Sequence, residues 1–199
     1  MSFHLDLIAI LISIGYLGIF AVVFAESGLL IGVFLPGDSL LFTAGLLASQ
    51  GYFNLWWLLV ICFVAAALGD SAGYAFGHKV GPKIFTKEDS WLWNKQHINR
   101  TKVFYDRYGA KVLVLARFLP VVRSLAPILA GVGMMRYRTF FFYNILGALL
   151  WSVGITCLGY YLGQLIPDID KYLLPIIGAI VILSVIPSVW EVWRNRHRD

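Results

Sequence analysis

The stretch Arg117-Phe118-Leu119-Pro120-Val121-Val122-Arg123 places two guanidinium groups inside an otherwise apolar segment that runs from Val112 to Met135. An arginine at bilayer depth costs between about 2.5 and 17 kcal/mol, depending on how far its side chain reaches toward the interface. Both residues therefore need anionic partners. The apolar stretches of the chain offer few carboxylates, namely Glu26, Asp38 and Asp70. We infer that these charges line a cavity that binds an anionic head group.

The composition is that of an integral membrane protein. Hydrophobic residues make up 59% and charged residues 14% of the 199 positions, a balance that soluble domains do not show. The net charge of +5 invites a nucleic-acid interpretation, but the basic residues cluster at the ends of apolar runs, where the positive-inside rule places them. We therefore expect no nucleic-acid partner. Cys62 and Cys157 both lie in apolar runs, which predicts free thiols.

Several segments are long and apolar enough to cross a bilayer as helices. The first, Leu7–Ala25, would be roughly 28 Å long, close to the thickness of the hydrocarbon core, and Glu26 is expected to end it. The other expected spans are Leu55–Gly77, Thr139–Gly163 and a terminal transmembrane helix within residues 172–193. A polar linker, residues 81–110, separates the second span from the third.

Two further apolar segments are interrupted by turn-forming residues. Gly28–Gln50 is broken at Pro36-Gly37-Asp38, and Val112–Met135 contains two prolines. Because proline removes a backbone donor and clashes with the preceding turn, each segment should form pieces too short to cross alone. We expect two re-entrant helical hairpins, shaped by Pro36, Gly37, Pro120 and Pro127.

The interrupted segments belong to an internal repeat. Each contains a Phe-Leu-Pro triplet followed by an Ala-Gly pair, which ends at Gly45 in the first copy and at Gly131 in the second. A Gly-Tyr-x-x-Gly motif begins 28 residues after each of these glycines, at Gly73 and at Gly159. Repeat 1 is predicted over residues 26–80 and repeat 2 over residues 111–166. Repeats built around broken hydrophobic segments point to the central site of a transporter.

The distribution of basic residues sets the predicted topology. If each broken segment enters and leaves on one side and both termini are cytoplasmic, thirteen Lys and Arg residues lie inside, with Lys171 outside. If both segments cross, the basic linker lands outside, contrary to the positive-inside rule. We therefore predict an all-α membrane protein with four transmembrane helices and two opposed re-entrant hairpins. It would form one domain, residues 1–199, in the cytoplasmic membrane.

Arg117 and Arg123 are the candidate phosphate-binding residues. Guanidinium groups match phosphate geometry with two parallel hydrogen bonds and stay charged at any relevant pH. The alternative is that they neutralise Glu26 and Asp38 in a buried ion lattice that holds the hairpins together. The two interpretations can coexist.

Glu26, Asp38 and Asp70 are the candidate proton-coupling residues. Desolvation disfavours an ionised carboxylate and a nearby arginine favours it, so a group balanced between the two effects can take up and release protons. Asp38 has an alternative role as the cap of a helix that starts at Ser39. Asp70, between Gly69 and Ser71, is either a coupling site or arginine partner, or a satisfied structural carboxylate.

Other kinds of chemistry lack their sequence signals. No His/Cys cluster has metal-ligand spacing, and no Gly-rich Lys-Ser/Thr loop is present. No histidine lies at membrane depth, where a phosphatase with a histidine nucleophile would place one beside the arginines. We therefore expect a transporter and no enzyme, with no metal and no cofactor.

These residues resemble the DedA family of bacterial membrane proteins, whose domain is also called the SNARE-associated or VTT domain. The resemblance covers roughly residues 15–165 and is most specific over Gly109–Gly131, which contains ARFLPVVRSLAPILAG. It also rests on Glu26-Ser27-Gly28, Phe34–Asp38 and Gly69-Asp70, and on a downstream pattern of Phe141, Asn144, Gly147 and Trp151.

The resemblance implies paired re-entrant hairpins and a lipid flippase driven by the proton motive force. The implied substrate is undecaprenyl phosphate or a phospholipid such as phosphatidylethanolamine, and the implied coupling ion is the proton. The family's essential acidic pair falls on Glu26 and Asp38, and its essential arginines fall on Arg117 and Arg123. Whether copies of the chain assemble into a homo-oligomer stays open. So do two other functions, a small-cation/proton antiporter that uses the three carboxylates and a non-transporting membrane scaffold.

Overall fold

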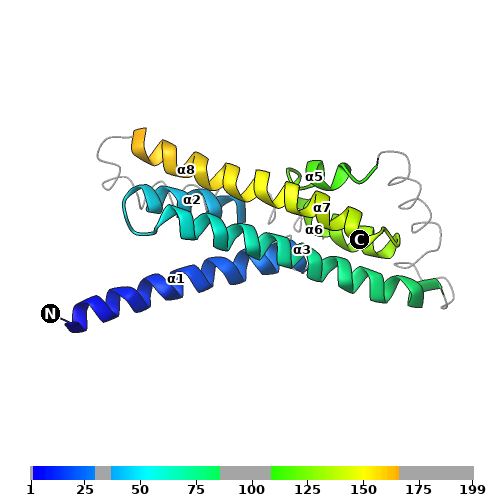
Figure 1. Ribbon diagram of the computed structural model, residues 1–199, viewed down its shortest axis with the longest axis horizontal. Helices are drawn as coiled ribbons and strands as arrows, with labels where there is room; N and C mark the ends of the chain where they lie inside the picture. Colours follow the sequence, from blue (N-terminus) through cyan, green and yellow to red (C-terminus); the bar gives the residue numbers. More distant parts are fainter. Residues whose placement is uncertain (1, 30–36, 86–108, 166–199) are drawn as a thin grey trace, which may run out of the picture. The chain divides into compact units, whose positions relative to one another are not determined.

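The computed structural model describes residues 2–29, 37–85 and 109–165 (Figure 1). Within these ranges the chain is helical and contains no strand, which confirms the all-α class for this part of the protein. The elements are, in order, α1 (Ser2–Gly28), α2 (Gly37–Ser49), α3 (Leu55–Phe85), α5 (Val112–Ala116), α6 (Pro120–Val132), α7 (Tyr137–Ala148), the π-helical turn η2 (Leu149–Val153) and α8 (Gly154–Leu165).

Within the part of the chain that the structure describes, two helices are found to be long and apolar enough to cross a membrane. They are Leu55–Val80 of α3 and Tyr137–Leu165, in which α7, η2 and α8 follow one another directly. Two predicted boundaries were wrong. α3 continues to Phe85, into the segment expected to be linker, and α1 continues to Gly28, so Glu26 lies inside the helix and does not end it.

The other topological predictions stay predictions. The terminal helix expected within residues 172–193 lies outside the described residues, as do Pro36 and most of the linker, residues 86–108. The number of spans, the depth to which the broken segments dip and the side of the membrane on which each terminus lies are therefore carried forward as expectations.

The interrupted segment of repeat 2 forms two short helices. α5 ends at Ala116, Leu119 is extended (φ −113°, ψ 108°), and α6 begins with Pro120 at its first position, where the missing donor of proline costs nothing. α6 contains Pro127 and has 13 residues, so its length is about 20 Å, less than the roughly 30 Å of a hydrocarbon core. α2 also has 13 residues and begins at Gly37.

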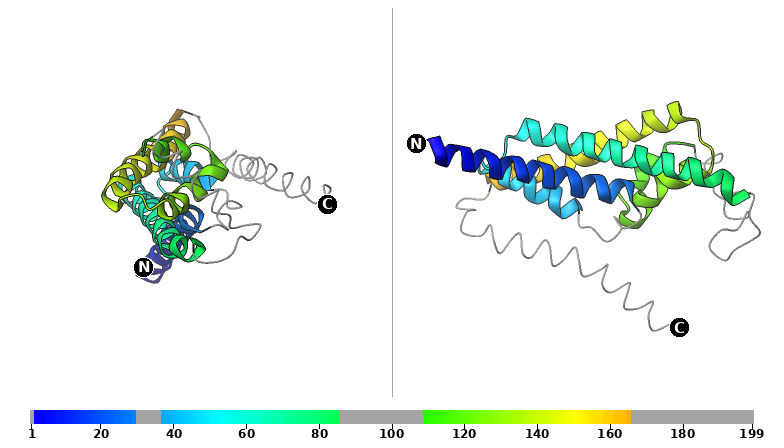
Figure 2. Two further views of the ribbon diagram at one scale, coloured as in Figure 1. Left: turned by 90° about the vertical axis from the view of Figure 1, so that its right-hand side faces the viewer. Right: turned by 90° about the horizontal axis from the view of Figure 1, so that it is seen from below.

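The chain divides into two compact units, and each unit takes helices from both predicted repeats. The first, named here the α2–α8 unit, comprises residues 2–22, 37–62 and 152–165 of the described chain. The second, named the arginine unit, comprises residues 23–29, 63–85 and 109–151. In the α2–α8 unit, α2 and α8 run side by side (Figures 1 and 2). In the arginine unit, α5 contacts both α6 and α7.

Glycines set the helix spacing in the α2–α8 unit. Gly45 of α2 lies against the backbone carbonyl of Thr156, and Gly159 of α8 lies against the carbonyl of Phe42. A Cβ atom at either glycine would overlap a backbone oxygen. Such small residues let the backbones of membrane helices approach closely.

The arginine unit uses the same device with different helices. Gly131 of α6 lies against the backbone carbonyl of Tyr74, and Gly77 of α3 lies against that of Ile128. Thus the second hairpin helix packs on the Gly-Tyr-x-x-Gly motif of repeat 1, while α2, from the first hairpin, packs on the same motif of repeat 2.

The apolar core of the arginine unit lies between α3, α5, α6 and α7. The ring of Tyr74 stacks on that of Phe140, with 4.4 Å between the centroids, and its hydroxyl donates to the carbonyl of Met135. The buried members of this core are Tyr74, Leu113, Ala116, Ala126, Ala130 and Phe140. The core holds the break between α5 and α6 in place, and with it the arginines on either side of the break.

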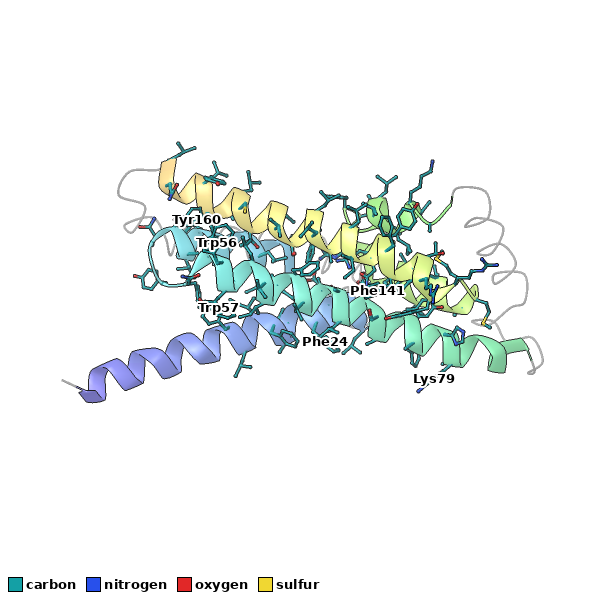
Figure 3. The ribbon with its side chains drawn as sticks, viewed as in Figure 1. Phe24, Trp56, Trp57, Lys79, Phe141 and Tyr160 are labelled. Atoms are coloured by element: carbon teal, nitrogen blue, oxygen red, sulfur yellow. The ribbon has the colours of Figure 1, made fainter. Side chains whose placement is uncertain are left out.

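Large apolar side chains are exposed on both long helices. Trp56 and Trp57, near the start of α3, are 76% and 65% exposed, and Phe141 is exposed on α7 (Figure 3). Exposed apolar surface on this scale is typical of contact with lipid.

Candidate functional site

Two ion pairs are buried in the arginine unit. Arg117 donates from Nη2 to Oδ2 of Asp70, and Arg123 donates from Nη2 to Oε1 of Glu26. The four residues are between 0% and 7% exposed. Because an uncompensated buried charge is costly, each pair depends on both of its members and on the hydrogen bonds around them.

The break between α5 and α6 allows both arginines to face the interior. In one continuous helix, residues six positions apart point in directions about 120° apart. Arg117 is the C-cap residue of α5, and Arg123 lies in the first turn of α6, after the extended residue Leu119. The proline-induced break thus supplies the change of direction that places both side chains among buried carboxylates.

Helix α7 supports Arg117 with two residues on one face. Oδ1 of Asn144 accepts a hydrogen bond of 2.7 Å from Nη2 of Arg117. Gly147 lies alongside the same side chain, and a Cβ there would come within 2.9 Å of Cδ of Arg117. The amide therefore binds the guanidinium, and the glycine leaves space for its stem.

The amide of Asn144 is itself held by α3. Its Nδ2 donates to the carbonyl of Ala67 at 3.0 Å and to Oγ of Ser71 at 3.3 Å. Oγ of Ser71 donates in turn to the carbonyl of Ala67 at 2.7 Å. These bonds fix the orientation of the Asn144 oxygen, and therefore the position of the Arg117 guanidinium beside Asp70.

Arg123 has a different setting. Its guanidinium carbon lies 4.9 Å from the ring centroid of Trp151 on η2, a geometry in which a cation is attracted by the face of the ring. Oγ of the next residue, Ser124, donates to the backbone carbonyl of Glu26 at 3.2 Å. The last turn of α1 is thus joined to α6 by both an ion pair and a hydroxyl group.

A glycine contact brings the helices of the two carboxylates together. A Cβ at Gly28, two residues after Glu26, would lie 2.5 Å from the carbonyl oxygen of Gly69. Gly69 directly precedes Asp70. The contact therefore sets how closely the two acidic residues, and the arginines paired with them, approach one another within the arginine unit.

The remaining predicted site residues lie on α2 and α6. Asp38 is half-buried in the first turn of α2, in the α2–α8 unit, where the helix dipole favours a carboxylate. Gly37 is buried at the start of α2, and Pro127 is buried inside α6. Across residues 2–29, 37–85 and 109–165, no group of three His, Cys, Asp or Glu side chains could hold a metal ion.

Three residues around the arginines received no site role from the sequence. Asn144, Gly147 and Trp151 are spaced by three and four positions, so they lie on one face of a helix. That spacing is the signal that could have identified them. Ser71 and Ser124 give no comparable signal, because isolated serines are common in membrane helices and their partners here are backbone groups or one amide.

Comparison with known proteins gives consistent matches. The model of the VTT domain family matches residues 35–161. Protein DedA of Escherichia coli K12 is 40% identical over 184 residues, which are 92% of this chain and 84% of that protein. An uncharacterized membrane protein of Mycobacterium leprae is 38% identical over 180 residues, 89% of this chain and 80% of that protein. Inner membrane protein YghB of E. coli K12 is 36% identical over 178 residues, 88% of this chain and 80% of that protein. No solved structure matches the chain.

Proposed function

Because the chain belongs to the DedA family of VTT-domain membrane proteins, we propose that it is a lipid flippase of the cytoplasmic membrane. In this proposal the proton motive force drives a phosphorylated lipid across the bilayer, either undecaprenyl phosphate or a phospholipid such as phosphatidylethanolamine. The supporting observation is the pair of buried arginines in one unit, each hydrogen-bonded to a carboxylate that a phosphate can replace.

The exchange of counter-ions gives the proposed mechanism. Proton uptake by Glu26 removes its negative charge and weakens its hydrogen bond from Arg123. The guanidinium is then available to a phosphate oxygen, which it binds with charge-assisted hydrogen bonds. The lipid tail stays in hydrocarbon throughout. Loss of the proton restores the pair with Glu26 and displaces the phosphate.

The second ion pair, Arg117 with Asp70, can undergo the same exchange of counter-ions, but its guanidinium is held by an additional hydrogen bond. Arg117 is held by Asp70 and by Asn144, which is fixed by α3. We assign Arg117 to the phosphate site together with Arg123, and Asp70 and Asp38 to proton coupling together with Glu26.

Reconstitution tests the proposal. Vesicles of phosphatidylcholine, with a pH gradient and a fluorescent phosphatidylethanolamine or a short polyprenyl phosphate, report flipping as loss of protection from a membrane-impermeant quencher. We expect Arg123→Ala to slow flipping at least about tenfold, because it removes a charged contact to the phosphate. Lys111→Ala, at an exposed position of the same unit, is the matched control and should flip at the wild-type rate. Wild-type flipping by Arg123→Ala would refute the phosphate site.

A non-transporting membrane scaffold is the second candidate, favoured by the burial of both ion pairs. Its discriminating variant exchanges the charges, Glu26→Arg with Arg123→Glu. A scaffold needs only the pair, so the exchanged variant should complement a deletion strain. A flippase should lose transport, since the cation leaves the hairpin helix. The hypothesis of a small-cation/proton antiporter gains no support. Glu26 and Asp70 each accept a hydrogen bond from an arginine, and the positive charge of that arginine would repel a transported cation.

A further inference from the structure

The helix from Tyr137 to Leu165 changes register at the π-helical turn η2. Its buried positions up to residue 151 are 140, 144, 147, 148 and 151, and its buried positions from residue 152 onward are 152, 156, 159 and 163. A regular helix would continue the first stripe at about positions 155, 158 and 162. The second stripe is displaced by one residue, which is the displacement that a π-bulge produces.

Two neighbouring residues of the turn are buried. Trp151 is 1% exposed and Ser152 is 0% exposed. Trp151 belongs to the arginine unit and is the residue whose ring lies over Arg123. π-turns occur often at functional sites, and this one orients a large aromatic ring toward one of the two buried cations.

Trp151 contacts the part of Arg123 that the carboxylate does not use. Glu26 accepts a hydrogen bond at Nη2, on the edge of the guanidinium, whereas the indole ring lies against its face at 4.9 Å from the centroid. The attraction between a cation and an indole face is greatest when both are removed from water, as they are here. The ring is therefore a second partner of the guanidinium, and it carries no charge.

We propose that Trp151 is a positioning residue for Arg123, which holds the guanidinium in place between the release of Glu26 and the arrival of a lipid phosphate. The inference rests on the proposed flippase function. Asn144 does the corresponding work for Arg117 through a hydrogen bond. For Arg123 the neutral partner is a ring face, whereas the anion that it binds, Glu26, accepts at the edge of the guanidinium.

The test weakens the ring's attraction for a cation while its size stays nearly constant. Tryptophan with zero to four ring fluorines is introduced at position 151 of the full chain by nonsense suppression. We expect flipping in the vesicles described above to fall about twofold per fluorine, and the melting temperature in detergent to fall in the same order. The matched series at Trp56, which is 76% exposed on α3 (Figure 3), should change neither quantity.

The outcomes distinguish a failure of the positioning role of Trp151 from a failure of the proposed flippase function. A melting temperature that is constant across the Trp151 series would refute the stacking interaction. A falling melting temperature with unchanged flipping would refute the positioning role. If Arg123→Ala abolishes flipping and the fluorine series does not affect it, the inference fails and the flippase stands. If Arg123→Ala flips at the wild-type rate, the proposed function fails and the positioning role fails with it.

Discussion

In the α2–α8 unit, the helix of the first hairpin lies against α8 through Gly45 and Gly159, whereas in the arginine unit the helix of the second hairpin lies against α3 through Gly131 and Gly77. The packing device is shared, but the buried polar side chains differ. Both units bury hydroxyl groups, those of Ser39, Thr43, Ser152 and Thr156 in the α2–α8 unit and those of Ser27 and Ser124 in the arginine unit, but the arginine unit also buries Glu26, Asp70, Arg117, Arg123 and Asn144. The two units therefore share the glycine-mediated helix packing, and the arginine unit in addition contains buried charged side chains.

The repeat makes this comparison possible residue by residue. The offset that relates Gly45 to Gly131 also relates Gly73 to Gly159, and it places Thr156 at the position of Asp70. Asp70, which pairs with Arg117 in the arginine unit, is therefore matched by a hydroxyl group in the α2–α8 unit.

The largest effect is expected when one member of a buried ion pair is removed. Arg117→Ala leaves Asp70 buried without its cation, and should lower the free energy of unfolding by about 3–5 kcal/mol. The measurement is thermal or denaturant unfolding in detergent micelles. The exposed variant Lys111→Ala should stay close to wild type.

A double variant separates the lost pair from lost packing. Arg117→Met with Asp70→Leu replaces both charges by apolar groups, a change that is often neutral for a buried pair. It should recover most of the stability that Arg117→Ala loses. A double variant as unstable as the single one would show that the charge of Asp70 is not the source of the loss.

An intermediate effect is expected from the glycines of the shared scaffold. Gly45→Ala and Gly131→Ala each drive a Cβ into a backbone oxygen of the facing helix, and should cost about 1–3 kcal/mol each. Gly154 has no atom within 4 Å of the corresponding Cβ position, so Gly154→Ala should be neutral or slightly stabilising. If only Gly131→Ala is destabilising, the two units do not share one packing device.

The smallest effect is expected at the neutral counterpart of Asp70. Oγ1 of Thr156 is buried and lies beside the thiol of Cys62, a weak hydrogen-bonding group. Thr156→Val should therefore change the free energy of unfolding by less than about 0.5 kcal/mol, since only a weak bond to a thiol is lost. Asp70→Asn, at the equivalent position of the other copy, removes a charged hydrogen bond and should cost more. Equal losses at the two positions would contradict the contrast between the units.

Much of this organisation could be read along the chain. The break at Pro120 follows from local backbone sterics, because proline cannot continue a helix that precedes it. The apolar composition and the scarcity of carboxylates indicate that Arg117 and Arg123 need buried partners. Helix ends were less predictable. Glu26 and the segment after Gly77, which contains His78 and Lys79, are helical and adjoin tertiary contacts, those of Gly28 with Gly69 and of Gly77 with Ile128.

The sequence by itself determined that the chain is a helical membrane protein with a repeated, proline-broken segment and two arginines in need of anions. Only the tertiary structure decided that Arg117 pairs with Asp70 and Arg123 with Glu26, partners 47 and 97 positions away along the chain. The physical reason is the distance along the chain over which each interaction acts. Helix formation and breakage depend on neighbours within a turn or two, whereas the pairing of buried charges depends on which helices pack together and on the register that glycines and a π-turn impose on them.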